Sequence, residues 1–273
     1  MASTEPGTFY DQHPFDWAPA GGPEETRAVV ARQLLDLLDR IDPQSLVLDI
    51  GCGPGRVLGY IARRGMHCVG LDRSRVSVRL AVDRYGAPGV VGDNLNLPFA
   101  TASADMVISD GVIHHTADPR AAFVENSRVL KPGGLMYLGV YKPHGRYPLL
   151  YRFPGGLIRR GLQHGWSRPL VVVFARVPYF LVHFLRSKGK RTWRGARNLF
   201  FDYFVTPQVA FLSREVIEDW CQALGIRISR YDPTPSSNVH SFVLVKDASP
   251  DRRCDTTISL DSEHMVAEGR ETA

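Results

Sequence analysis

The chain has 273 residues, of which 44% are apolar and 22% charged, and its net charge is +5. These values are typical of a soluble globular protein with one large domain, or with a domain that carries an insertion. The four cysteines form no CxxC pair and no metal-binding spacing with histidine, so the sequence gives no sign of a metal centre. The charge is unevenly distributed, because residues 142–200 contain 13 Lys or Arg and no acid, which leaves 20 basic and 28 acidic residues elsewhere.

Residues 1–22 are rich in Pro, Gly and aromatic residues, and we expect them to be irregular and flexible. The stretch FYDQHPFDW (9–17) suits a lid over a ligand, with Tyr10 and Phe15 as its cover; an untied terminus is the alternative. This end has neither the basic n-region nor the apolar h-region of a signal peptide. We therefore expect a cytoplasmic protein.

An alternation of helices and strands begins at residue 23. Apolar spacing predicts a helix over 23–41, and strands are predicted at 45–51, 67–72, 89–93, 104–110 and 135–141, with helices between them. Ser74 is a predicted helix N-cap, and Asp118 followed by Pro119 is another. Alternating strands and helices predict an α/β fold with a parallel sheet covered on both faces.

The alternation stops after residue 141 and resumes with a helix from Ser213 to Leu224 and two strands at 226–232 and 239–246. We therefore predict five parts: a lid (1–22), a core (23–141), a helical cap inserted after the fifth strand (142–212), the rest of the core (213–246) and a disordered acidic tail (247–273).

A glycine-rich loop, VLDIGCGPGR (47–56), follows the first strand, where a ligand can approach the backbone and the next helix. A dinucleotide site needs a third small residue at the position of Arg56, and a P-loop needs Lys followed by Ser or Thr. Neither pattern is present, so the loop does not favour a diphosphate ligand.

Four motifs in order resemble class I S-adenosylmethionine-dependent methyltransferases. They are LDIGCGPG, VGLDRS, VGDNLNLPF and ADMVISDGVIHH, the last followed by RVLKPGG, and together they cover about residues 45–141. The resemblance implies a Rossmann-like, seven-stranded, mostly parallel sheet with an antiparallel last strand, to which the two closing strands contribute. It also implies S-adenosylmethionine as cofactor and a methyl transfer reaction, without a metal.

The resemblance assigns roles in cofactor binding to residues at the strand tips. Asp72 would accept the ribose hydroxyls, and Asp93 the adenine amino group, with a backbone amide from Asn94 beside it. Gly51, Gly53 and Gly55 would let the backbone approach the methionine part, and Asp49 would orient this loop. The full set of expected cofactor residues also contains Cys52, Arg73, the Ser109 carbonyl and Tyr10.

Catalytic residues are harder to choose from the sequence. His114 and His115 follow the fourth strand, and a tight turn lets only one of them point inward; we select His114 as a general base, and Tyr203 as a weaker candidate. A structural role is the alternative for each of them. Tyr141, Arg191, Arg194 and His240 are the expected substrate contacts.

The insertion combines apolar and basic segments, as in FLRSKGKRTWRGARNLF (184–200). The apolar run 170–185 is too short to span a bilayer. Three partners fit: an anionic small substrate such as a prenyl or phosphorylated compound, an anionic membrane, or RNA, which we rank last; a solvated or inter-subunit face is the alternative. We expect a small-molecule methyltransferase of secondary or lipid-like metabolism, alternatively a membrane-associated quinone or lipid methyltransferase, or a non-methylating cyclase or scaffold. The oligomeric state is not predicted.

Overall fold

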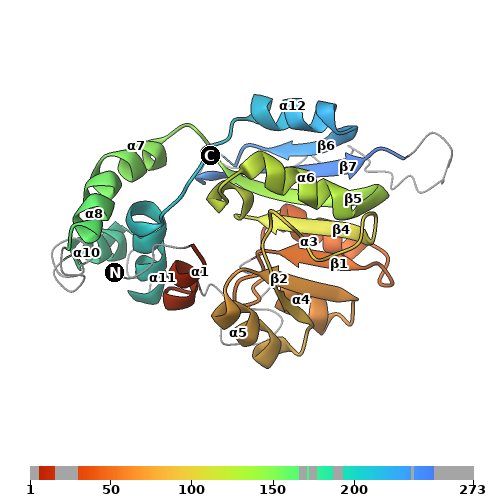
Figure 1. The fold of residues 1–273 in the computed structure, drawn as a ribbon, viewed down its shortest axis with the longest axis horizontal. Helices are drawn as coiled ribbons and strands as arrows, with labels where there is room; N and C mark the ends of the chain where they lie inside the picture. Colours follow the sequence, from red (N-terminus) through yellow and green to blue (C-terminus); the bar gives the residue numbers. More distant parts are fainter. Residues whose placement is uncertain are drawn as a thin grey trace, which may run out of the picture.

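The computed structural model describes residues 6–15, 30–165, 171, 177–186, 193–234 and 237–248. Its centre is a seven-stranded sheet in the order β3-β2-β1-β4-β5-β7-β6 (Figure 1). The strands are β1 (Val47–Ile50), β2 (Cys68–Asp72), β3 (Gly89–Val91), β4 (Ala104–Asp110), β5 (Leu130–Tyr141), β6 (Ile226–Asp232) and β7 (Val239–Lys246). All pairings are parallel except those of β7, which runs antiparallel to both β5 and β6. The predicted Rossmann-like α/β fold is confirmed.

Helices cover both faces of the sheet. One apolar core lies between the sheet and the helices α6 (Pro119–Val129) and α12 (Arg214–Ala223), and includes Phe123 and Ile217. The other core lies under α3 (Arg32–Arg40), α4 (Leu58–Arg63) and α5 (Arg75–Tyr85). Alternation along the strands supplies both cores, because Leu48 of β1 faces the first and Val47 faces the second.

Three helices begin at the side chains that the sequence predicts. The hydroxyl of Ser74 accepts a hydrogen bond from the Ser77 amide, the Asp118 carboxylate from the Ala121 amide, and the Ser213 hydroxyl from the Val216 amide. Each bond satisfies an amide that has no partner inside its helix. The fifth strand starts five residues before the predicted position, at Leu130, because the Gly-rich turn after α6 is already part of the strand.

The expectation of an irregular N-terminal segment is wrong for residues Pro6–Gln12, which form helix α1. This helix is held by tertiary contacts. The carboxylate of Asp11 accepts hydrogen bonds from the Ser74 hydroxyl at 2.7 Å and from the Val76 amide at 3.3 Å. Asp11 therefore ties α1 to the first turn of α5.

The segment after β5 contains the helices α7 (Arg146–Arg152), α8 (Pro154–Gln163), α10 (Val177–Arg186) and α11 (Trp193–Phe200). Helix α11 continues directly into a π-helix, η3 (Phe201–Val205). We call residues 142–212 the cap. In Figure 1 the cap stands to one side of the sheet, and α1 lies between α11 and the core. Its own apolar cluster contains Val171, Phe200 and Phe204. Arg191 and the tail residues 249–273 lie outside the described residues.

Candidate active site

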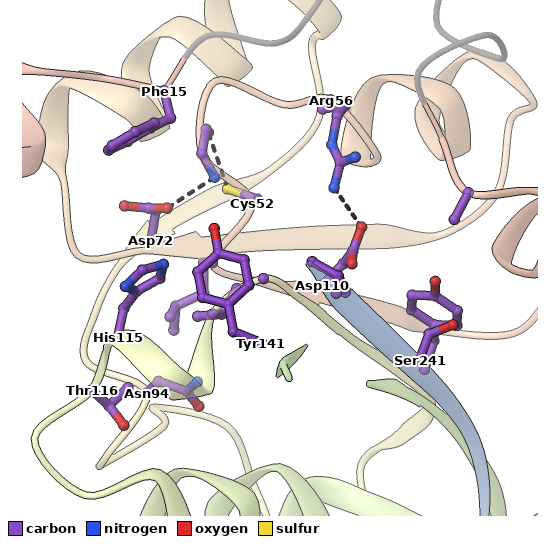
Figure 2. Close-up of a pocket in the computed structure, with 18 of the residues that line it drawn as sticks. Phe15, Cys52, Arg56, Asp72, Asn94, Asp110, His115, Thr116, Tyr141 and Ser241 are labelled. Carbon is purple, nitrogen blue, oxygen red and sulfur yellow. Dashed lines mark hydrogen bonds and ion pairs between the residues drawn. The ribbon is translucent and has the colours of Figure 1, made fainter. Parts of the chain in front are cut away.

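A cavity of about 800 Å³ lies at the carboxyl ends of the parallel strands, the usual position of ligands in open α/β sheets. A pocket of this size holds a drug-sized molecule. It brings together ten of the residues selected from the sequence, namely Tyr10, Phe15, Gly51, Cys52, Gly53, Asp72, Arg73, Asp93, Asn94 and Tyr141. Figure 2 shows part of this wall, with Asp72, His115 and Tyr141 facing the same space.

The glycine loop after β1 forms one wall. Gly51 has a φ of +75°, and a Cβ at this position would lie 2.3 Å from a methyl group of Val112, so both backbone conformation and space require glycine. Asp49 does not line the cavity. Its buried carboxylate accepts a hydrogen bond from the Leu58 amide at 3.0 Å and so joins the loop to the start of α4. Burial raises the pKa of Asp49 to about 7.

Asp72 ends β2 and faces the cavity below Phe15 (Figure 2). One carboxylate oxygen accepts a hydrogen bond from the Gly53 amide at 2.9 Å, and the other accepts from the Ser74 amide at 2.8 Å. Burial raises the pKa of Asp72, although these amide bonds oppose the effect. Since each carboxylate oxygen has two lone pairs, Asp72 can still accept further hydrogen bonds from a ligand.

The tip of β3 contributes Asp93 and Asn94. Asp93 pairs loosely with Arg73, at 3.9 Å, and accepts a hydrogen bond from the Leu95 amide at 3.0 Å. Asn94 is buried and lines the cavity, and both atoms of its side-chain amide have no hydrogen-bond partner among the described residues. A buried amide without partners is costly, so this position fits a polar ligand.

The opposite wall is built around Asp202 of η3. Its side chain is 11% exposed and accepts hydrogen bonds from the hydroxyl groups of Tyr141 at 2.7 Å and Tyr147 at 3.3 Å. Burial raises the pKa of Asp202 to about 7, and the two tyrosine hydrogen bonds limit the rise. Asp202 was not among the residues selected from the sequence. The signal available was its position as the first acid after the acid-free segment.

The two histidines lie on a short 3-10 helix, η1 (Ile113–His115), and the structure separates their positions. His115 lines the cavity, whereas His114 is fully buried behind it, and its ring packs with a centroid distance of 4.0 Å against the Tyr141 ring. Neither ring nitrogen of His114 has a hydrogen-bond partner among the described residues. The selection of His114 as the residue facing the substrate therefore does not agree with the structure. Neighbouring residues of a short 3-10 helix point in different directions, so His115 faces the cavity and His114 does not.

The environment of His115 defines its protonation. Its Nδ1 lies 3.0 Å from the carbonyl oxygen of Gln208, which can only accept, so Nδ1 carries the proton. Its Nε2 is 3.9 Å from a carboxylate oxygen of Asp202. Burial lowers the pKa of His115 to about 4, so the ring is neutral near pH 7 and Nε2 can accept a hydrogen bond.

Other selected residues do not line the cavity. The His240 ring is buried, with Nε2 bonded to the Leu212 carbonyl at 3.0 Å and Nδ1 to the Tyr231 hydroxyl at 3.2 Å, which is a structural role. Tyr203 stacks on Tyr147 and hydrogen-bonds with Asn238. The cavity lining also leaves out Gly55 and Ser109. Arg194 lies in α11, but its side chain, like Arg191, is not among the described parts of the chain.

An ion pair that was not expected from the sequence also lies on the cavity wall. Arg56, the residue that argued against a dinucleotide site, places a guanidinium nitrogen 2.5 Å from Asp110 at the end of β4 (Figure 2). The Asp110 carboxylate fits in this position because residue 139 is glycine. A Cβ at position 139 would lie 2.3 Å from Asp110 Oδ1. The pair joins the glycine loop to β4.

Comparison with known proteins agrees with this geometry. Residues 48–138 match a family model described as a methyltransferase domain. The probable tRNA methyltransferase 9B of Homo sapiens is 42% identical over 102 residues, which are 36% of this chain and 22% of that protein. The chain thus spans less than a quarter of that relative's length.

Solved structures show the same fold. A SAM-dependent methyltransferase from Methanosarcina mazei superposes with a TM-score of 0.54 at 17% identity, covering 81% of this chain and 99% of the other. The [4+2]-cyclase SpnF does so with a TM-score of 0.54 at 14% identity, covering 89% and 95%. The fold and the tips of its strands define a domain of the class I S-adenosylmethionine-dependent methyltransferases. The match to the methyltransferase domain covers residues 48–138, a third of this chain, and includes the glycine loop and the tips of β2 and β3.

The cavity fits this cofactor. The Asp72 carboxylate and the unpartnered Asn94 amide can hydrogen-bond a nucleoside, and at Gly53 a Cβ would meet nothing within 4 Å, so the loop leaves open space beside its backbone. Among the described residues, no cluster of three or more His, Cys, Asp or Glu could hold a metal ion. Within the same residues, no helix has the length and apolar character needed to cross a bilayer.

Proposed function

We propose that this protein is an S-adenosylmethionine-dependent methyltransferase that methylates a neutral hydroxyl or amine of a small-molecule acceptor. One observation carries the proposal: Asp72 and Asn94 share a single cavity with Asp202, a carboxylate from the cap. The first two residues suit a nucleoside, and the third suits a group that loses a proton. The family resemblance supports the assignment of the cofactor, and the cavity geometry supports the assignment of the acceptor.

The cofactor would be held by the residues at the strand tips. When bound, it supplies a methyl group already activated by a positively charged sulfur. Asp72 would accept the ribose hydroxyls, the tip of β3 with Asp93 and Asn94 would hold the adenine, and the backbone from Gly51 to Gly53 would lie against the methionine part. Tyr10 of α1 and Phe15 would cover this side. These contacts chiefly orient the reactants and exclude water.

Asp202 is the residue that we assign as proton acceptor. A general base works best when its pKa lies near the working pH, and burial brings the pKa of Asp202 to about 7. The acceptor oxygen or nitrogen would bond to the methyl carbon as the bond from that carbon to the cofactor sulfur breaks, leaving S-adenosylhomocysteine, and the acceptor's proton would pass to the Asp202 carboxylate. The hydroxyl of Tyr141 fixes that carboxylate by a hydrogen bond of 2.7 Å. Where the acceptor is an amine, Nε2 of neutral His115 can accept a hydrogen bond from its second proton and orient it.

The charges on the wall bear on the acceptor class. The cavity is lined by six aspartates and four arginines, so its described lining does not favour the strongly anionic substrate considered from the sequence. The human relative is named for tRNA, but the similarity covers only 36% of this chain and 22% of that protein. A neutral, partly apolar small molecule of secondary or lipid-like metabolism is the acceptor that we infer, and a nucleic acid acceptor remains to be tested beside it.

The deciding experiment is a methyl-acceptance assay with labelled S-adenosylmethionine. Small-molecule extracts and a tRNA pool are incubated separately with the protein and with Asp202→Asn, and mass spectrometry follows the gain of one methyl group and the release of S-adenosylhomocysteine. Methylation in the small-molecule arm that Asp202→Asn abolishes is the expected result. Methylation confined to tRNA would overturn the acceptor assignment. Conversion of a compound without S-adenosylhomocysteine would overturn methyl transfer itself and indicate a cyclase.

A further inference from the structure

The cap exposes apolar side chains far more than the core does. Of all large hydrophobic side chains in the described residues, the five most exposed lie in the cap: Leu149, Phe153, Leu157, Leu181 and Leu185, at 50% to 73% exposure. Those outside the cap are four valines with at most 46% exposure. Large clustered apolar groups on a surface commonly mark an interaction site.

The exposed residues form stripes along two parts of the cap. Leu149, Phe153 and Leu157 are four residues apart, and backbone hydrogen bonds link the Phe153 amide to the Leu149 carbonyl and the Leu157 amide to the Phe153 carbonyl. They therefore lie on successive turns of one side of α7 and α8. Leu181 and Leu185 repeat the spacing on α10. We call these residues the apolar stripes.

Basic side chains border the first stripe. Arg146, Arg152 and Arg160 are exposed on α7 and α8. By contrast, Arg159 is turned inward, where its guanidinium donates to the carbonyl oxygens of Tyr151 and Phe204. The outer arginines thus belong to the same surface as the stripe, within a segment that has 13 basic residues and no acid from 142 to 200.

This combination selects one class of partner. A second copy of the chain in a symmetric dimer would place the same basic surface against itself, which like charges oppose. RNA is bound mainly by basic and planar side chains, whereas the stripes are largely aliphatic. An anionic bilayer supplies both complements, since aliphatic side chains enter its interfacial region while arginines remain among the lipid headgroups.

We propose that the outer face of the cap, formed by the apolar stripes and the bordering arginines, binds the surface of an anionic lipid membrane. The helices that carry it, α7, α8 and α10, stand at the side of the molecule away from the sheet (Figure 1). Binding there leaves the strand tips free. The inference does not depend on the methyl transfer reaction, although a membrane site brings the cavity close to lipid-soluble compounds.

Co-sedimentation of the full chain with lipid vesicles tests the proposal. Vesicles of phosphatidylcholine alone are compared with vesicles that also contain phosphatidylglycerol, at about 0.1 M and about 1 M salt. We expect binding to the anionic vesicles that weakens at high salt. The double variant Phe153→Asp and Leu157→Asp should reduce the affinity by about tenfold or more, because it places charges in the apolar stripe. Val124→Asp, an exposed valine of α6, is the matched control and should bind as the unchanged protein does.

Folding of each variant is checked by circular dichroism, and the substituted side chains are exposed, so the fold should be retained. Three results would overturn the proposal. The first is the absence of binding to anionic vesicles. The second is binding that the cap variant does not alter. The third is a protein that does not bind vesicles but forms a dimer in light scattering, or binds tRNA in a gel-shift assay, and loses this property in the variant Phe153→Asp and Leu157→Asp.

Discussion

The hydroxyl of Tyr141 donates a hydrogen bond of 2.7 Å to Asp202, across 61 positions of the sequence. Tyr141 ends the fifth strand, and Asp202 lies in the π-helix through which the cap returns to the core. The bond therefore joins the rigid sheet to the inserted segment at the cavity wall. It also holds a carboxylate in a position where burial makes its charge costly.

Asp202→Asn should lower turnover by about 10²–10⁴, the usual contribution of a general base, while the affinity for S-adenosylhomocysteine in calorimetry stays unchanged. Asp83→Asn, an exposed position on α5, is the matched control. Turnover of the unchanged protein should rise with pH toward a plateau above about pH 7, because the base must be ionised. Full activity of the Asn variant would remove Asp202 from the reaction.

As the pH rises from about 4 to about 7, the free energy of unfolding of Asp202→Asn should increase relative to that of the unchanged protein. The folded carboxyl holds its proton up to a pKa of about 7, whereas the unfolded one releases it near its ordinary value. Since the folded state binds more protons in this window, stability falls there as pH increases. Between about pH 5 and about pH 7 the relative gain should be on the order of 2 kcal/mol in urea unfolding. A constant difference would contradict the raised pKa.

Asp72→Ala should weaken binding of S-adenosylhomocysteine by at least about tenfold, on the order of 1.4 kcal/mol, in calorimetry. The carboxylate positions the Gly53 and Ser74 amides and faces the cavity, so its loss removes both ligand contacts and loop order. Asp83→Ala serves as the control. An unchanged affinity would show that the nucleoside lies elsewhere.

Gly51→Ala should lower the free energy of unfolding by about 2 kcal/mol or more, because positive φ and a crowded site both oppose a side chain. Gly133→Ala separates the two causes. Gly133 has a similar φ of +78°, but a Cβ there would meet nothing within 4 Å. Chemical denaturation of both variants should therefore show a larger loss for Gly51. Equal losses would mean that contact with Val112 is relieved without cost.

Removal of residues 1–20 should weaken cofactor binding markedly, since α1 contributes Tyr10 to the cavity and is tied by Asp11 to Ser74, two residues after Asp72. Asp11→Ala, which removes only the tie, should give a smaller loss in the same titration. Wild-type affinity in the truncated protein would show that α1 is not a lid.

Much of the fold could be predicted because local chemistry decides it. The bounds of β4, β6 and β7 match the predicted segments, since apolar runs and turn residues delimit them, and Ser74, Asp118 and Ser213 begin helices as expected. The strand-tip residues Asp72 and Asn94 reach one cavity because parallel strands end at the same edge of a sheet.

The acceptor side of the cavity could not be predicted in the same way. Asp202 reaches it only through the packing of the cap, and no local pattern encodes a contact across 61 positions. The choice between His114 and His115 depends on one residue of turn geometry. Helix α1 has seven residues, too short to be stable alone, so its formation depends on contacts such as that between Asp11 and Ser74.

The π-helix at Phe201–Val205 has a consequence for how this protein diversifies. Both the amide and the hydroxyl of Thr206 bond to the Phe201 carbonyl, at 2.7 and 3.0 Å, so the junction is fixed at the point where the chain rejoins the core. Asp202 lies inside the junction, while the exposed helices lie before it. Natural variation can therefore exchange the outer cap as a module, and change where the protein is placed or what it admits, without altering the carboxylate that we assign as proton acceptor.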